Sequence, residues 1–208
     1  MVKNQHAIGL VNNWSKGSFD DTMKLVVALT GSSGVIYGIE VLQILHRLNI
    51  ETHLVISEWG ERNILIETNH PVDFVKSLAS KYYSNDNMAA PISSGSFKTD
   101  GMVIVPCSMK TLSSISYGYD DNLISRAAGV CIKESRTLVV VPRETPLSRI
   151  HLQNMIRLAD NGVVLLPAMP GFYHRPKSID DMIAHVVGKI LDQFGIEHNA
   201  YRRWGNTA

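Results

Sequence analysis

The sequence predicts a three-layer α/β/α fold built on a mostly parallel sheet. Short, uninterrupted runs of Val, Leu and Ile recur along the chain, and each is followed by a segment in which apolar residues have helical spacing. Strands without polar alternation are buried on both faces, which is typical of parallel sheets covered by helices on each side. The 208 residues are enough for one such domain with a sizeable core.

The expected strands are apolar runs bounded by Gly, Pro, Ser or charged residues. The first of them stops at the turn Gly31-Ser32-Ser33-Gly34, where small residues replace the β-branched ones. In chain order, the strands are expected at 24–30, 51–57, 101–106, 137–142 and 162–167.

The expected helices fill most of the intervening segments. The first begins at Val35, because Ile39 and Leu42 continue its apolar face at intervals of three or four residues. The other helices are expected at 58–68, 71–83, 109–117, 122–134, 147–161 and 179–194, with a loop rich in Gly and Ser at 88–100.

Residues 1–22 differ in character from the rest of the chain. They are polar apart from a brief apolar patch at 7–11, which is too polar for a signal peptide, and they contain none of the arginines of a transit peptide. We expect a flexible N-terminal extension, followed by a single ligand-binding domain over 23–208.

The composition excludes several classes of partner. The 20 Lys and Arg nearly balance the 19 Asp and Glu, so no broad surface for nucleic acid is expected. No apolar stretch reaches transmembrane length, which argues against a membrane partner. Cys107 and Cys131 match no metal-ligand spacing and are too few for a disulfide framework. We therefore expect a cytoplasmic protein without a metal site.

The turn at 31–34 joins a strand directly to a helix N-terminus. Free helix amides and the positive end of the helix dipole meet there, and small residues let a phosphate approach, so the turn predicts a phosphorylated ligand. It has neither the Gly-x-Gly-x-x-Gly spacing of dinucleotide sites nor the Gly-Lys-Ser/Thr end of a P-loop. The same residues would also form a tight connection that binds nothing.

A second turn of this kind follows the strand at 101–106. Ser108 and Thr111 offer hydroxyls, and Lys110 offers a countercharge, at the start of the next helix. Taken alone, Ser108 also fits an ordinary N-cap. Because the carboxyl ends of parallel strands share one edge of a sheet, two such turns could hold the two ends of one phosphorylated cofactor.

Two later segments carry charged and aromatic residues at strand ends. Arg143 and Glu144 are adjacent between two prolines, where they form either a catalytic pair or a solvated ion pair. The rigid loop 167–176 contains Tyr173 and His174, and it suits either phosphate capture beneath a lid or a packed surface loop.

Other polar residues form no motif by themselves. Arg126 and Lys133 are seven residues apart on one helix face, which is also the pattern of a solvated stripe. The same interpretation applies to Glu67, Lys189 and Trp204 when each is taken alone. Six histidines are assigned surface or core roles: His46, His53, His70, His151, His185 and His198.

Together, these segments resemble the UbiX-type flavin prenyltransferases, in the branch historically grouped with the phenolic or hydroxyarylic acid decarboxylases. The resemblance runs in order from about Met23 to Trp204. The matching pieces are 30–34, 51–57, 92–97, 106–112, 126–128, 141–147, 150–155 and 170–174.

The resemblance implies a homo-dodecamer of flavodoxin-like or Rossmann-like protomers with FMN near the interfaces between them. It implies that a dimethylallyl group passes from dimethylallyl monophosphate to N5 and then C6 of reduced FMN, without a metal. The prenylated FMN would serve a UbiD-type aromatic acid decarboxylase.

Carried over residue by residue, the resemblance implies three sets of site residues. The FMN contacts would be Gly31, Ser32, Ser33, Ser57, Ser108, Met109, Lys110, Thr111 and Arg143. The prenyl-phosphate site would be Lys133, Arg143, Glu144, Tyr173, Lys189 and Trp204. The catalytic residues would be Ser33, Glu67, Glu144 and Tyr173.

Two positions depart from the family pattern. Asn87 stands where some relatives carry an aromatic residue, and Lys189 replaces a common arginine, which gives up bidentate phosphate geometry. The main alternative is an FMN-dependent cysteine decarboxylase of the same superfamily, but its Pro-x-Met-Asn-x-x-Met segment is absent from this sequence. A non-catalytic flavin carrier and direct decarboxylation of an aromatic acid are further alternatives.

Overall fold

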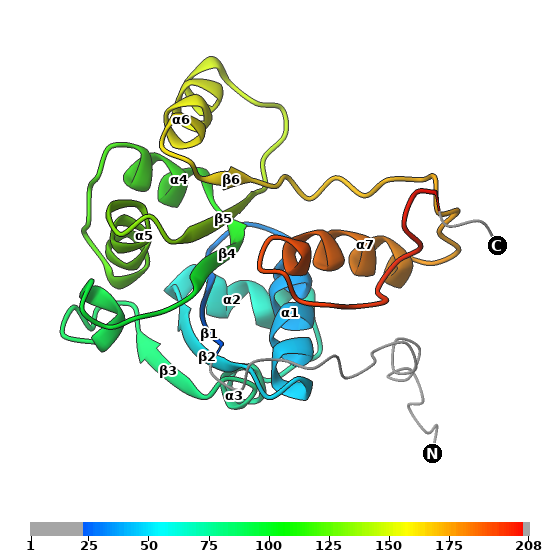
Figure 1. Ribbon diagram of the computed structural model, residues 1–208, viewed down its shortest axis with the longest axis horizontal. Coiled ribbons are helices and arrows are strands. Elements are labelled where there is room, and N and C mark those ends of the chain that lie inside the picture. The colour runs from blue at the N-terminus through cyan, green and yellow to red at the C-terminus, as the bar shows by residue number, and fades with distance from the viewer. Residues whose placement is uncertain (1–22, 206–208) are drawn as a thin grey trace.

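Six parallel strands form the centre of the computed structural model, which describes residues 23–205 (Figure 1). The strands are β1 (Lys24–Leu29), β2 (Glu51–Ile56), β3 (Lys81–Ser84), β4 (Gly101–Cys107), β5 (Thr137–Pro142) and β6 (Val164–Leu165). They lie in the order β3-β2-β1-β4-β5-β6. The parallel α/β fold expected from the sequence is therefore confirmed.

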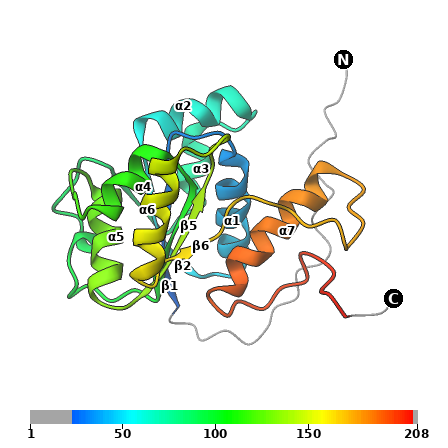
Figure 2. The same ribbon diagram turned by 90° about the horizontal axis from the view of Figure 1, so that it is seen from above.

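Helices cover both faces of this sheet. Figure 2 shows α1 (Val35–Arg47) and α7 (Ile179–Asp192) on one side, with α4 (Met109–Ser116), α5 (Leu123–Lys133) and α6 (Arg149–Asp160) on the other. The remaining elements are α2 (Glu58–Glu67), α3 (Val72–Ser77) and the short 3₁₀ helix η1 (Pro91–Ser93).

The side chains of β1 point alternately to the two faces of the sheet, and the core therefore has two halves. Leu25, Val27 and Leu29 pack with α1 and α7, whereas Val26 and Ala28 pack with α4 and α5. Successive side chains of a strand point to opposite faces, so a strand buried on both sides must be apolar throughout. This explains why the strands are continuous apolar runs in the sequence.

The direction of winding reverses between β1 and β4. The chain passes from β1 outward through β2 to β3, and then crosses to β4 on the other side of β1. The segments after β1 and β4 therefore turn to opposite faces and leave a crevice at the carboxyl ends of these two strands. Thr30 joins them here, because its Oγ1 donates to the Pro106 carbonyl at 2.8 Å and accepts from the Ser108 amide at 2.7 Å.

The prediction of a helix over 71–83 was wrong. The segment 71–83 contains only the short helix α3 and then the edge strand β3, in which Tyr82 and Tyr83 pair with Leu54 and Val55 of β2. Aromatic residues favour strands once a neighbouring strand offers its free hydrogen-bonding edge, and only the folded sheet provides that edge. The expected strand at 162–167 is also shorter than predicted, with its ladder confined to Val164–Leu165.

Residues 1–22, expected to be an extension, lie outside the described residues. Within 23–205, no helix combines the length and apolar character needed to cross a bilayer.

Candidate functional site

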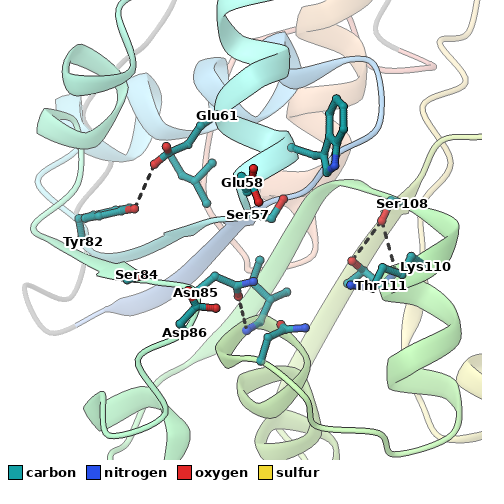
Figure 3. A pocket seen from close by; sticks show the side chains of 15 residues that line it. Ser57, Glu58, Glu61, Tyr82, Ser84, Asn85, Asp86, Ser108, Lys110 and Thr111 are labelled. Carbon is teal, nitrogen blue, oxygen red and sulfur yellow. Dashed lines mark hydrogen bonds between the residues drawn. The ribbon is translucent and has the colours of Figure 1, made fainter.

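A cavity of about 500 Å³ lies at the carboxyl edge of the sheet, beside the reversal point. Small-molecule sites have volumes of about 300–1,000 Å³, so the cavity is large enough for a cofactor. Figure 3 shows Ser57 and Glu58 in the middle of the lining. Ser108 and Thr111 of the α4 turn lie on one side of them, and Tyr82 of β3 and Glu61 of α2 lie on the other. Five residues predicted for the FMN site line this cavity: Gly31, Ser57, Ser108, Lys110 and Thr111.

The α4 side of the cavity supplies hydroxyls and positive charge. Ser108 caps α4, because its Oγ accepts from the Thr111 amide at 3.3 Å and donates to the Thr111 hydroxyl at 3.1 Å. The positive end of the α4 dipole and the exposed Lys110 therefore face the cavity together. This side suits an anionic group such as a phosphate.

The β1 side of the cavity has room only for a glycine. A Cβ on Gly31 would lie 2.3 Å from the Cβ of Trp59, so no larger residue fits without moving α2. The next residue, Ser32, has a buried Oγ with no hydrogen-bond partner among residues 23–205. A buried hydroxyl without a partner loses stabilising contacts, so this atom fits a ligand that supplies the missing hydrogen bond.

Glu67 occupies part of the turn that the sequence assigns to a phosphate. Its Oε2 accepts from the Gly34 amide at 2.8 Å and from the Val35 amide at 3.3 Å, at the N-terminus of α1. A carboxylate from the end of α2 therefore already supplies the negative charge that this helix end attracts. The structure thus favours the α4 side for a ligand phosphate, and Ser33, which precedes Gly34 in the chain, is exposed.

Arg143 and Glu144 line a second cavity, of about 270 Å³, at the ends of β5 and β6. Both side chains are exposed, and Glu144 Oε1 accepts from the Thr145 amide at 3.0 Å. The other walls are mostly apolar, with Leu147, Met155 and Met169 among them. A site with one charged end and apolar walls can hold a small ligand that has an anionic head and a hydrocarbon tail.

Tyr173, in the loop before α7, belongs to a third group of residues, which come together beside that helix. Its hydroxyl is 3.2 Å from Nε2 of His185, and the Trp204 ring meets the Tyr173 ring edge-on with centroids 5.5 Å apart. Lys189 lies one helical turn after His185. Three predicted substrate residues are thus gathered here: Tyr173, Lys189 and Trp204.

Asp192 ties the C-terminal segment to α7. Its carboxylate accepts from the Tyr201 hydroxyl at 2.7 Å, from Arg203 at 2.6 Å and from Nε2 of His198 at 3.1 Å. Burial acts to raise the pKa of Asp192, but the hydrogen bonds from Arg203 and Tyr201 outweigh it and lower the pKa. The carboxylate therefore stays charged and holds the segment that carries Trp204.

Sequence reasoning missed Asp192 and gave His185 only a generic role. The spacing of His185, Lys189 and Asp192 by four and three residues along one helix was the available signal, because such residues share a face.

Lys133 is separated from the other predicted site residues within one chain. It ends α5, just before β5 begins, and so it lies at the amino edge of the sheet, where it pairs with Glu134. The sites around Gly31, Arg143 and Tyr173 follow the carboxyl ends of strands or lie on α7. One chain therefore does not bring Lys133 to them.

Comparison with known proteins places the chain in a family. A family model described as Flavoprotein matches residues 15–191. A probable UbiX-like flavin prenyltransferase from Escherichia coli O157:H7 is 51% identical over 183 residues, which cover 88% of this chain and 93% of the relative. Both comparisons extend over most of the chain, and the residues matched by the family model include all six strands.

Solved structures agree with this assignment. A dodecameric FMN-dependent UbiX-like decarboxylase from Escherichia coli O157:H7 has a TM-score of 0.87 at 51% identity, covering 88% of this chain and 100% of its own. AnUbiX (PadA1), solved with FMN and dimethylallyl pyrophosphate, has a TM-score of 0.88 at 49% identity, covering 90% of this chain and 100% of its own.

The cysteine decarboxylases considered as the main alternative share the fold alone. Peptidyl-cysteine decarboxylase EpiD is 20% identical, with a TM-score of 0.55, and covers 72% of this chain and 82% of its own. The high identity to UbiX-like proteins extends over nearly their whole length, and the sheet and turns described above match that fold. The chain belongs to the UbiX-like flavin prenyltransferase family.

Proposed function

We propose that this protein transfers the dimethylallyl group of dimethylallyl monophosphate to N5 and then C6 of reduced FMN, and releases inorganic phosphate. The observation that carries the proposal is the cavity at the β1/β4 reversal point, in a chain about half identical to a protein solved with FMN and dimethylallyl pyrophosphate. Bound reduced FMN would supply the nucleophilic nitrogen and carbon that accept the prenyl group.

The residues around the first cavity fit FMN. The hydroxyls of Ser57, Ser108 and Thr111 can bind polar groups of the flavin chain, and Lys110 with the α4 dipole can bind its phosphate. The unpartnered Ser32 Oγ and the glycine contact at Gly31 fit a ligand held close to the backbone. We place Ser33, Met109 and Arg143 at the edges of the same FMN site.

The prenyl phosphate needs positive charge around its leaving group. When the C–O bond breaks, its electron pair goes to a phosphate oxygen, and preorganised donors stabilise that developing charge. We assign this role to Arg143, Lys133, Lys189 and the Tyr173 hydroxyl, so that no metal is required. Glu144 would orient these cations, Glu67 with Ser33 would lie by the flavin, and Trp204 would exclude water.

We further propose that the site is completed by neighbouring copies of the chain in a closed homo-oligomer, as in the dodecameric relative. Lys133 lies apart from the other proposed phosphate ligands within one chain, so a second copy must supply it if it takes part. The helix α6 exposes Ile150 and Ile156, at 67% and 59%, which suits burial between copies. Prenylated FMN would then pass to a UbiD-type decarboxylase.

The direct test is an anaerobic reaction of the purified protein with reduced FMN and dimethylallyl monophosphate. Mass spectrometry of the extracted flavin should show the gain of one five-carbon unit, and oxidised FMN should give no such product. Binding of FMN without any mass change would indicate a flavin carrier instead. Release of carbon dioxide from a cysteine-terminated peptide would indicate the cysteine decarboxylase alternative.

Tyr173→Phe is the sharpest variant, because it deletes one hydroxyl and little volume. If that hydroxyl binds the leaving phosphate, single-turnover transfer should slow by about a hundredfold, with FMN affinity unchanged. Wild-type rates would show that the phosphate site has been assigned to the wrong residues.

A further inference from the structure

His185 lies between a backbone amide and the Tyr173 hydroxyl. Its Nδ1 is 3.3 Å from the Gly171 amide nitrogen, and its Nε2 is 3.2 Å from the Tyr173 hydroxyl. The side chain extends from the middle of α7, and the residue is 6% exposed. Both ring nitrogens are therefore engaged in a largely buried setting.

These two contacts fix the tautomer of the imidazole. A backbone N–H can only donate, so Nδ1 of His185 must accept the hydrogen bond from Gly171. A neutral imidazole carries one proton, which then resides on Nε2. Nε2–H consequently donates to the Tyr173 oxygen.

The charge around His185 favours this neutral form. Burial lowers the pKa of His185, and the nearby His174 and Lys189 lower it further, with Asp192 acting in the opposite direction. The His174 ring stacks on His185 with centroids 4.9 Å apart, so a cation there would face a second imidazole. Protonation of Nδ1 would also set two N–H groups against each other at Gly171.

The loop that carries Tyr173 is held close to this imidazole. A Cβ on Gly171 would lie 3.0 Å from the Tyr173 ring and 3.5 Å from Cε1 of His185. The absence of a side chain at Gly171 therefore lets its amide reach Nδ1 while the Tyr173 ring stays beside it. The Gly171 backbone and the Tyr173 phenol therefore contact the same side chain of α7.

We infer that His185 is a positioning residue for Tyr173: it donates to the phenolic oxygen and so leaves the phenolic hydrogen free to be donated to an anionic ligand. A tyrosine that donated to Nε2 would present only lone pairs to a phosphate, which would repel it. The inference rests on the proposed function in one respect, because that function makes the ligand a prenyl phosphate. The tautomer itself follows from the contacts alone.

The tautomer can be measured without any turnover. Nitrogen-15 spectra of protein labelled at its eight histidines should be compared with those of His185→Gln, and the signal that the substitution removes should come from a ring whose Nδ1 is unprotonated and whose Nε2 carries the proton. An Nδ1–H tautomer or a doubly protonated ring for His185 at neutral pH would overturn the inference.

The role is tested by a double-mutant cycle on single-turnover prenyl transfer with saturating reduced FMN. His185→Phe keeps an aromatic ring but removes both hydrogen bonds, and it should slow transfer by about ten- to a hundredfold. In the Tyr173→Phe background it should cost nothing more, because the hydroxyl it orients is gone. Partial recovery is expected in His185→Gln, whose amide can both donate and accept.

Two comparisons separate this role from general damage. His46→Phe removes a histidine in the last turn of α1 that contacts the Leu78 carbonyl, and it should leave the transfer rate unchanged. FMN affinity should be equal in wild type and His185→Phe. Additive losses in the cycle would refute the positioning role. A wild-type protein that transfers no prenyl group would refute the proposed function, while the nitrogen-15 spectra would still decide the tautomer.

Discussion

Thr30→Val tests whether the two turns of the flavin site depend on one buried hydroxyl. Thr30 is 1% exposed, and its Oγ1 links Pro106 and Ser108 across the reversal point of the sheet. Valine has nearly the same shape, so the substitution removes the hydroxyl without creating a cavity. The Ser108 amide then loses the hydrogen-bond partner that the structure gives it.

The expected cost follows from these contacts. A buried amide left without a partner costs about 1–3 kcal/mol. The Pro106 carbonyl keeps its hydrogen bond from the Thr30 amide at 3.2 Å, so losing the second bond, from the Thr30 hydroxyl, costs the lower end of about 0.5–1.5 kcal/mol. The added methyl group returns about 0.8 kcal/mol of apolar burial. The net loss is about 2 kcal/mol, which lowers Tm by about 4–8 °C in a domain of this size.

Thr52→Val is the matched control. Thr52 is also 1% exposed, and its Oγ1 accepts from the Ser80 amide at 3.2 Å, away from the cavity. Both variants should lose similar stability in thermal unfolding followed by circular dichroism. Only Thr30→Val should weaken FMN binding, by about tenfold in titration calorimetry, because Ser108 lines the cavity. An unchanged Tm in Thr30→Val, or equal FMN affinities in the two variants, would refute this reasoning.

Three further predictions concern single contacts. Glu67→Gln keeps an acceptor for the α1 amides but loses the charge, so the free energy of unfolding should fall by only about 0.5 kcal/mol. A large loss of prenyl transfer in this variant would identify a catalytic role for Glu67 beyond capping. The lowered pKa of Asp192 means that its stabilisation is present above the unfolded carboxyl pKa, about 3.9, and is lost as pH falls through the folded value. Protection of residues 196–204 from hydrogen exchange, taken relative to the intrinsic rate at the same pH, should therefore fall below about pH 4, and Asp192→Asn should lower it at pH 7; unchanged protection in both conditions would contradict the tether. Gly31→Ala should cost about 1–3 kcal/mol and abolish FMN binding, because its Cβ would collide with Trp59; retained FMN binding would show that α2 can move freely.

The sequence by itself determined the layered architecture and one edge of the sheet as the place for a ligand. The stretches 25–29 and 138–142 are apolar throughout because parallel strands are buried on both faces, so the length and ends of these strands are local properties of the sequence. Small or hydroxyl-bearing residues that follow strands, such as Gly31 after β1 and Ser108 after β4, line the cavity because parallel strands all end at the same edge of the sheet.

Only the tertiary structure decided which of these residues act together. Segment 81–84 became a strand because β2 offered it a free edge, and Glu67 reached the α1 amides because α2 ends beside them. Likewise, the role of His185 depends on a loop amide fourteen positions earlier in the chain. Hydrogen bonds between distant segments depend on the mutual placement of packed elements, and no local pattern encodes that placement.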